Sequence, residues 1–278
     1  MPPGTLYVVA TPLGNLGDLT PRAAELLRTV AVVAAEDTRR TRGLLTHLGA
    51  APRLLSFHAH SPATRAESLL DILQSGRDVA LVSDAGTPVV SDPGAPLIDT
   101  VRAAGIRVVP IPGASAVATA VSVSGFEGDR YLFLGFVPRK GADRQRLLAR
   151  AAKEEWPTVF FEAPNRLVDL LGDLAKEAGP ARRATVAREL TKMHEEIRTG
   201  TLEELVAHFE AAEPRGEITL VLSGTGEPEA PPDRSGEGTA LAEALLSAGL
   251  TRRDVVEQLT ERLGIARNEA YRMVMEIQ

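Results

Sequence analysis

The sequence predicts an α/β fold with two domains and a small C-terminal helical unit. Short apolar runs rich in β-branched residues alternate with amphipathic stretches of helical period up to Leu222. Loops rich in glycine, proline and acidic residues follow the apolar runs of the first half. We expect an N-terminal α/β domain over 1–124, a second α/β domain over 125–223, a flexible linker over 224–238 and a helical unit over 239–278.

The composition is that of a globular chain, since 278 residues with 44% hydrophobic and 24% charged side chains suffice for a core. No apolar run approaches the roughly 20 residues of a membrane span, and no basic, apolar leader opens the chain. The absence of cysteine excludes disulfides, a thiolate nucleophile and cysteine zinc sites. A net charge of −6 disfavours indiscriminate nucleic-acid binding but permits a local basic face. We expect a cytoplasmic protein with no membrane partner.

The first strand, expected over 5–10, leads into the loop TPLGNLGD at 11–18. In this loop Pro12, Gly14 and Asn15 let the backbone approach a ligand closely. The loop lacks the spacing of a Walker A motif or a dinucleotide fingerprint, so no nucleotide-phosphate cradle is expected here.

The second strand, expected over 30–35, ends in Glu36 and Asp37, with Arg39 and Arg40 behind them. These acids are candidates for chemistry at the strand end. They are also explained as surface charge at the start of a helix through 48, where acids favour the helix dipole.

His58 and His60 follow an apolar run and share a face if that run is a strand. Two histidines without a nearby third ligand make a poor metal site. We therefore favour polar or substrate contact for this pair and expect no metal.

The central stretch begins with a buried strand at 79–82 and continues into Asp84. Ligands of open α/β sheets bind at the carboxyl ends of strands, which makes Asp84 the first candidate binding residue. The alternative is that Asp84 only caps a turn. Asp92 before Pro93 predicts a helix N-cap, with the helix running to 104 and Gly105 closing it.

A further strand, expected over 106–111, ends in the small-residue segment PGASA at 112–116. The helix expected over 117–123 would offer free backbone N–H groups at Ser115 and Ala116 to an anionic group. Tight packing of this helix on the sheet is the alternative reason for small residues.

The second half carries more β character. Strands are expected over 131–136, 158–161, 184–190, 196–199 and 218–222, with helices near 143–153, 165–177 and 201–210. Beyond the linker, helices are expected near 239–247, 252–262 and 266–276. Thr251 and Asp254 have a capping spacing, and Gly249 and Gly264 are plausible stops. Arginines and acids in the loops point to a cleft between the domains.

A series of ordered motifs resembles one known family. They are TPLGNLGD at 11–18, AEDTR at 35–39, FHAH at 57–60, SDAGTP at 83–88 with SDPG at 91–94, PGAS at 112–115, GFVPR at 135–139, EAPNR at 162–166 and RELTK at 188–192. This series resembles the ribosomal RNA small subunit methyltransferase I family, a branch of the tetrapyrrole methylase superfamily. The likeness covers about residues 4–222 in order, and NEAY at 268–271 adds to it.

The resemblance implies a tetrapyrrole-methylase-like fold of two α/β domains, S-adenosylmethionine in the cleft between them, and a homodimer. It implies methylation of the 2′-hydroxyl of a cytidine in 16S rRNA, near the decoding centre of the 30S subunit. The cofactor residues implied by the matched motifs are Asp84, Ala85, Gly86, Thr87, Ser115, Ala116, Pro12, Gly14 and Asn15.

A ribose hydroxyl is a weak nucleophile, so a group that takes its proton would help. The candidates are Glu36, Asp37, His58, His60, Glu189 and Lys192. The first four rank ahead because they lie in the domain that carries the cofactor loop.

RNA affinity would come from phosphate contacts. The candidates are Arg39, Arg40, Arg139, Lys140 and Arg166. Some of them are equally well explained as charged residues on a solvated helix surface.

Two other classes of function stay open on the sequence. A superfamily relative could methylate a small acceptor, such as a tetrapyrrole carbon or a modified histidine; the arginines beside the motifs and the helical tail argue against it. A binding module that senses the cofactor without catalysis would retain cofactor affinity and lack methyl transfer.

Overall fold

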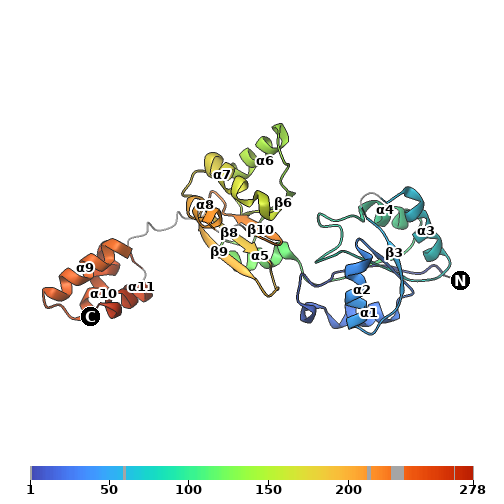
Figure 1. Ribbon diagram of the computed structural model, residues 1–278, viewed down its shortest axis with the longest axis horizontal. Helices are drawn as coiled ribbons and strands as arrows, with labels where there is room; N and C mark the ends of the chain where they lie inside the picture. The colour runs from blue at the N-terminus through green and yellow to red at the C-terminus, as the bar shows by residue number, and fades with distance from the viewer. Residues whose placement is uncertain (1, 59–60, 212–213, 227–234, 266, 278) are drawn as a thin grey trace. The chain divides into compact units, whose positions relative to one another are not determined.

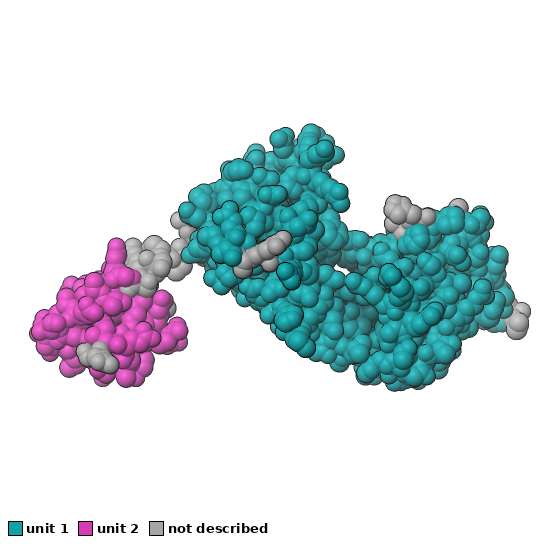
Figure 2. All heavy atoms as spheres, viewed as in Figure 1, with its two compact units in different colours: residues 1–229 teal, residues 230–278 magenta. Residues whose placement is uncertain are grey.

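The computed structural model describes residues 2–58, 61–211, 214–226, 235–265 and 267–277. The chain forms two compact units, one over 1–229 and one over 230–278, coloured separately in Figure 2. The first unit contains two five-stranded sheets, and the described part of the second unit is helical.

The first sheet is entirely parallel, with strand order β3-β2-β4-β1-β5 (Figure 1). Its strands are β1 (Leu6–Val9), β2 (Val32–Ala35), β3 (Arg53–Ser56), β4 (Val79–Val82) and β5 (Val108–Ile111). β2 and β4 are buried along their whole length, as expected for central strands covered on both faces. The predicted parallel α/β arrangement of the first half is confirmed.

Helices cover both faces of this sheet because consecutive strand residues point to opposite sides. Val79 and Leu81 of β4 share a core with α3 (Ala63–Gln74) and α4 (Ala95–Ala103). Ala80 and Val82 share the opposite core with α1 (Pro21–Thr29) and α2 (Thr38–His47). A short 3-10 turn, η1 (Leu16–Asp18), lies between β1 and α1.

One local expectation in this half is wrong, and one cannot be followed beyond His58. Asp92 does not cap a helix: α4 begins at Ala95 with Gly94 as its N-cap residue and Pro96 in its first turn. The segment before it is irregular, since Val89 and Ser91 have positive φ of 75° and 64°. Strand β3 ends at Ser56, so His58 lies in a loop and not on a strand; His60 lies outside the described residues.

The second sheet is mixed, with order β6-β7-β10-β8-β9, in which only β6 and β7 pair in parallel. Its strands are β6 (Leu132–Phe136), β7 (Thr158–Glu162), β8 (Arg183–Arg188), β9 (Glu196–Thr201) and β10 (Ile218–Leu222). One face packs against α6 (Ala142–Lys153), α7 (Leu167–Ala178) and α8 (Leu202–Ala211), and the short turn η2 (Pro164–Arg166) precedes α7.

Helix α5 (Ala116–Ser124) follows the last strand of the first sheet but packs against the second sheet (Figure 1). Its buried residues Val117, Ala120 and Val121 share a core with Val159 and Val221. The loop between β5 and α5 therefore lies where the two halves of the first unit meet.

The described part of the second unit is a three-helix bundle of α9 (Ser235–Ser247), α10 (Arg252–Leu263) and α11 (Arg267–Glu276) around a small apolar core. The expected capping is present, because Thr251 Oγ1 accepts a hydrogen bond from Asp254 N–H and Gly264 ends α10 in a left-handed conformation. Helix α9 begins at Ser235, four residues before the expected start. Among the described residues, no helix is long and apolar enough to cross a bilayer.

Candidate active site

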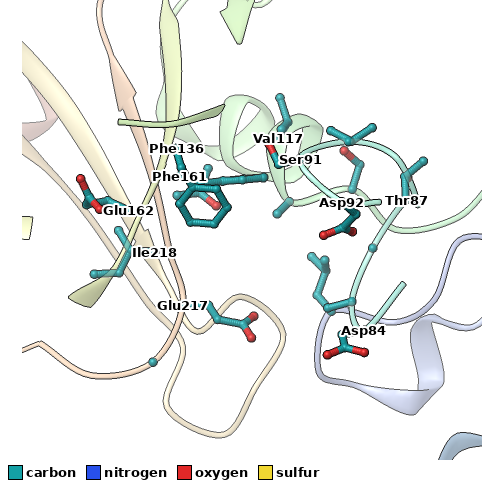
Figure 3. Close-up of a pocket in the computed structure, with 18 of the residues that line it drawn as sticks. Asp84, Thr87, Ser91, Asp92, Val117, Phe136, Phe161, Glu162, Glu217 and Ile218 are labelled. Atoms are coloured by element: carbon teal, nitrogen blue, oxygen red, sulfur yellow. The ribbon is translucent and has the colours of Figure 1, made fainter. Parts of the chain in front are cut away.

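One cavity of about 460 Å³ in the first unit is lined by residues from both sheets. The first half contributes Leu13, Glu36, Arg40, Asp84, Ala85, Gly86, Thr87, Val90, Ser91, Asp92, Ser115, Ala116 and Val117. The second half contributes Phe136, Phe161, Glu162, Ala163, Pro164, Gly216, Glu217, Ile218 and Thr219. Figure 3 shows the rings of Phe136 and Phe161 on one side and Asp84, Thr87 and Asp92 on the other.

The loop after β4 is fastened to its neighbours by backbone and hydroxyl hydrogen bonds. Thr11 and Gly86 exchange two backbone hydrogen bonds of 2.9 and 3.0 Å. The Thr87 hydroxyl donates to the Ala114 carbonyl at 3.1 Å. Gly86 has φ of 80°, and a Cβ added there would lie 3.2 Å from Leu13 Cδ2, so a larger residue would be strained at this turn. The ends of β1, β4 and β5 thus form one rigid frame.

Asp84 joins this frame to the end of β2. Its Oδ1 accepts a hydrogen bond of 2.9 Å from the backbone N–H of Asp37, and its Oδ2 lies 3.9 Å from Arg40 Nε. The hydrogen bond leaves part of the carboxylate facing the cavity, since Asp84 lines it and its side chain is 27% exposed.

Five acidic residues line the cavity: Glu36, Asp84, Asp92, Glu162 and Glu217, of which Glu162 is buried and paired with Arg166. Burial, and then the charge of Asp84, raise the pKa of Glu36 above its usual value. Burial, and then the charges of Glu36, Asp84 and Glu217, raise the pKa of Asp92 to about 6. Arg40 is the one cation that lines the cavity among the described residues, with its Nη1 3.7 Å from Glu217 Oε1. The cavity is therefore electronegative.

Glu189 and Lys192 form an ion pair outside the cavity lining, with 2.7 Å between Oε1 and Nζ. Lys192 Nζ also lies 3.2 Å from Glu217 Oε2. Burial lowers the pKa of Lys192, but the two carboxylates outweigh it and the pKa is raised. Burial likewise raises the pKa of Glu189, but the hydrogen bonds from Lys192 and the Glu217 N–H, together with the charges of Lys192 and Arg188, outweigh it and the pKa is lowered.

The loop after β1 packs on this ion pair. A Cβ on Gly14 would lie 2.2 Å from Lys192 Cγ, and Asn15 N–H donates to Thr191 Oγ1 at 3.2 Å. Pro12, Gly14 and Asn15 are absent from the cavity lining, to which their neighbour Leu13 contributes. The structure thus places this glycine-containing loop at the contact between the two halves.

Asp37 and His58 also lie outside the cavity lining. Asp37 caps α2, and hydrogen bonds from Arg39 lower its pKa to about 2. His58 is exposed, and its backbone N–H donates to Ser61 Oγ. Of the proton-acceptor candidates in the described part of the chain, only Glu36 lines the cavity.

The basic candidates divide into four exposed side chains and one, Arg166, that is largely enclosed. Arg39 and Arg40 have side chains 90% and 60% exposed, and Arg139 and Lys140 are exposed. Arg166, in contrast, lies 3.0 Å from the buried Glu162 carboxylate and donates a hydrogen bond of 2.6 Å to the Val137 carbonyl. Arg166 therefore fastens β6 to the turn after β7.

Sequence reasoning missed the wall formed by the second sheet. Phe136, Phe161 and Ile218 sit within ordinary strand patterns, and Glu217 reads as a turn residue. Asp92 was missed because the adjacent proline suggested a helix cap. No group of three or more potential ligand residues in the described ranges is arranged to hold a metal ion.

Comparison with known proteins shows the family to which this chain belongs. Residues 5–206 match the family model described as Tetrapyrrole (Corrin/Porphyrin) Methylases. A Synechocystis protein named Ribosomal RNA small subunit methyltransferase I is 45% identical over 276 residues, which is 99% of each chain. The chain belongs to the ribosomal RNA small subunit methyltransferase I family of tetrapyrrole methylases.

Other comparisons agree with this family. A Pseudomonas aeruginosa protein of the same name is 41% identical over 281 residues, covering 100% of this chain and 99% of that one. The solved structure of the methyltransferase CobJ superimposes with a TM-score of 0.63 at 19% identity, covering 82% of this chain and 97% of that one. The last likeness confirms the expected tetrapyrrole-methylase fold, and family membership makes the chain a methyltransferase.

Proposed function

We propose that this chain transfers a methyl group from S-adenosylmethionine to the 2′-hydroxyl of a cytidine in 16S rRNA, near the decoding centre of the 30S subunit. The observation that carries the proposal is a cavity that combines five acidic residues with an aromatic wall. The name of the relatives supplies the acceptor, because it specifies ribosomal RNA of the small subunit.

The residues present suit S-adenosylmethionine. Its sulfonium and ammonium groups are cationic, and carboxylates and aromatic faces both attract cations in a partly dry site. Its adenine has flat aromatic faces, which suits the half-buried ring of Phe161. When bound, the cofactor supplies an electrophilic methyl group on a positively charged sulfur.

The loop ends of the first sheet would hold the cofactor. Asp84 offers a carboxylate, and Ala85, Gly86 and Thr87 offer a fixed backbone with little side-chain bulk. Ser115 and Ala116 present small side chains at the start of α5. Pro12, Gly14 and Asn15 act indirectly in this proposal, by holding Leu13 and the frame against the second half.

Glu36 is the residue we assign as proton acceptor. It lines the cavity, and its raised pKa brings the carboxylate closer to the basicity that proton abstraction near neutral pH requires. Glu36 would accept the hydroxyl proton as the acceptor oxygen bonds to the methyl carbon and the carbon–sulfur bond breaks, which leaves neutral S-adenosylhomocysteine. The fixed carboxylates nearby orient the reacting groups.

The exposed cations Arg39, Arg40, Arg139 and Lys140 would contact phosphates of the particle. Because the whole chain is acidic, we propose a folded 30S subunit as the acceptor instead of free RNA. The resemblance extends the proposal to a homodimer that acts in the cytoplasm, where 30S subunits occur.

The test is transfer of labelled methyl groups from S-adenosylmethionine to 30S subunits that lack their own modifications. The expected result is label that maps to a single 2′-O-methylcytidine of 16S rRNA. Label that appears only on an added tetrapyrrole acceptor would contradict the proposal and favour the small-acceptor function.

A further inference from the structure

Phe136 is the last residue of β6, and it lines the cavity with 57% of its surface exposed. Its neighbour in the aromatic wall, Phe161, is half-buried. An exposed phenyl ring at a cavity edge offers apolar surface that the described part of the chain does not cover. Such a ring is available to a ligand that arrives from outside.

A bulge turns this ring toward the cavity. Alternation along a regular strand would place Phe133 and Phe136 on opposite faces of the sheet. Both rings nevertheless pack edge to face on Phe161, with centroid distances of 4.9 and 5.5 Å. The register of β6 against β7 shifts between these two residues, and Gly135 has φ of 66°. The extra residue therefore re-aims Phe136, a common use of bulges beside active sites.

The bulge lies against the irregular loop of the first half. A Cβ on Gly135 would lie 3.3 Å from Ser91 Oγ. Val90, in the same loop, also lines the cavity and is 39% exposed. Positive φ at Val89, a β-branched residue, is costly and persists only where the surroundings hold it. Two irregular backbone segments thus meet where Phe136 and Val90 present apolar surface at one edge of the cavity, with Asp92 nearby on the loop (Figure 3).

We propose that Phe136 stacks on the nucleobase of the acceptor nucleotide. The inference rests on the proposed RNA substrate. Bases taken out of a helix commonly stack on aromatic side chains, and stacking tolerates any base face. The reacting hydroxyl belongs to the ribose attached to that base. Stacking the base on Phe136 therefore keeps this hydroxyl close to the carboxylates of the cavity. The more enclosed ring of Phe161 serves the cofactor, whereas the exposed ring of Phe136 serves the RNA.

The experiment compares Phe136→Ala with wild type in two assays, calorimetric binding of S-adenosylmethionine and steady-state methylation of 30S subunits. We expect cofactor affinity within about twofold of wild type and a rise of roughly tenfold in KM for 30S subunits, in line with the loss of one base stack. Phe136→Trp should restore most of the lost affinity because it keeps an aromatic face. Tyr131→Ala removes an exposed aromatic ring outside the cavity lining and should change neither quantity.

Each contrary outcome has a distinct meaning. An unchanged KM in Phe136→Ala overturns the inference while the proposed function stands. A fall in cofactor affinity with unchanged KM also overturns it and assigns the ring to the adenine. Wild-type protein that binds cofactor but does not label 30S subunits overturns the proposed function itself, and the inference with it.

Discussion

The two walls of the cavity are built in opposite ways. The wall from the first sheet consists of loops after parallel strands, carries most of the carboxylates and is fixed by backbone hydrogen bonds. The wall from the second sheet consists largely of side chains on or just beyond strands, and two phenyl rings dominate it. Polar side chains gather in these loops because backbone groups and water can provide their hydrogen-bond partners there. Apolar side chains are presented more readily by a sheet, because the packed strands hold them in fixed positions.

The two walls also differ in what they do for stability. Packing among Phe133, Phe136 and Phe161 buries apolar surface and stabilises the second sheet. The carboxylates repel one another and lose solvation, as the raised pKa values of Glu36 and Asp92 show. The acidic residues of the first wall therefore lower the stability of the folded state, and a bound cationic ligand would offset that destabilisation. The first wall thus supplies the groups that take part in the reaction, and the second wall supplies apolar surface for binding. The four sets of variants below test that division.

The largest effect is expected on turnover in Glu36→Gln. Removing the proposed proton acceptor should lower kcat by roughly 10²–10⁴-fold while cofactor affinity changes little. Single-turnover methylation of 30S subunits at saturating cofactor measures this. Glu25→Gln, an exposed acid on α1, is the matched control. Full activity of Glu36→Gln would show that Glu36 is not the proton acceptor, and the other candidates for that role would then be tested.

The next effect is expected in Phe161→Ala, which opens the aromatic wall. Loss of this half-buried ring should cost about 2–4 kcal/mol of unfolding free energy and weaken S-adenosylmethionine binding at least several-fold. Phe209→Ala is a useful control, since Phe209 is buried on the opposite face of the same sheet. It should cost similar stability in denaturant unfolding and leave cofactor affinity unchanged. Equal losses of affinity in both variants would show that the effect on binding is only a loss of stability.

A smaller effect is expected in the pH dependence of stability of Asp92→Asn. A carboxyl group with a raised pKa in the folded state destabilises that state above about pH 6, and the penalty disappears below the ordinary value of 3.8. After discounting for solvent screening, the gain from Asn should be about 1–2 kcal/mol at pH 8 and near zero at pH 3.5. Thermal unfolding of both proteins across this range measures the difference. A gain that grows toward low pH would contradict the electrostatic account.

The smallest effect is expected for the exposed cations of the second half. Replacing Arg139 and Lys140 with alanine should weaken binding to 30S subunits a few-fold and reduce the slope of log affinity against log salt by up to about two. Cofactor affinity should not change, because neither side chain lines the cavity. An unaltered salt slope would mean that these residues are only solvated surface.

The sequence predicted the acidic wall far better than the aromatic wall. Asp84 and Glu36 follow apolar strands directly, and strand ends of a parallel sheet meet at one edge, so their proximity followed from topology. Phe136 escaped prediction because its orientation depends on a bulge at Gly135, which alternation does not reveal. Asp92 was misassigned because the neighbouring proline gave a valid helix-start signal, yet the chain makes its turn two residues later through Gly94 and Pro96.

Long-range pairing explains the remaining differences. Gly14 and Asn15 belong to a loop suited to a ligand, but they contact Lys192 and Thr191, which lie far along the chain. Arg166 looked like a phosphate contact, but it pairs with Glu162, a residue buried by the second sheet. Helix α5 continues the first sheet in sequence and packs on the second in space. Such contacts depend on the folded arrangement of both sheets, and no local pattern encodes them.

The most direct test of the central claim is calorimetric titration of S-adenosylmethionine into wild type and Asp84→Asn. Asparagine keeps an oxygen that can accept the Asp37 N–H, so the variant removes charge while preserving the loop contact. We predict one site per chain and an affinity roughly tenfold weaker in the variant. Asp71→Asn, an exposed carboxylate on α3, should bind as wild type does. Equal affinity of Asp84→Asn and wild type would contradict the assignment of the cofactor to the cavity between the two sheets.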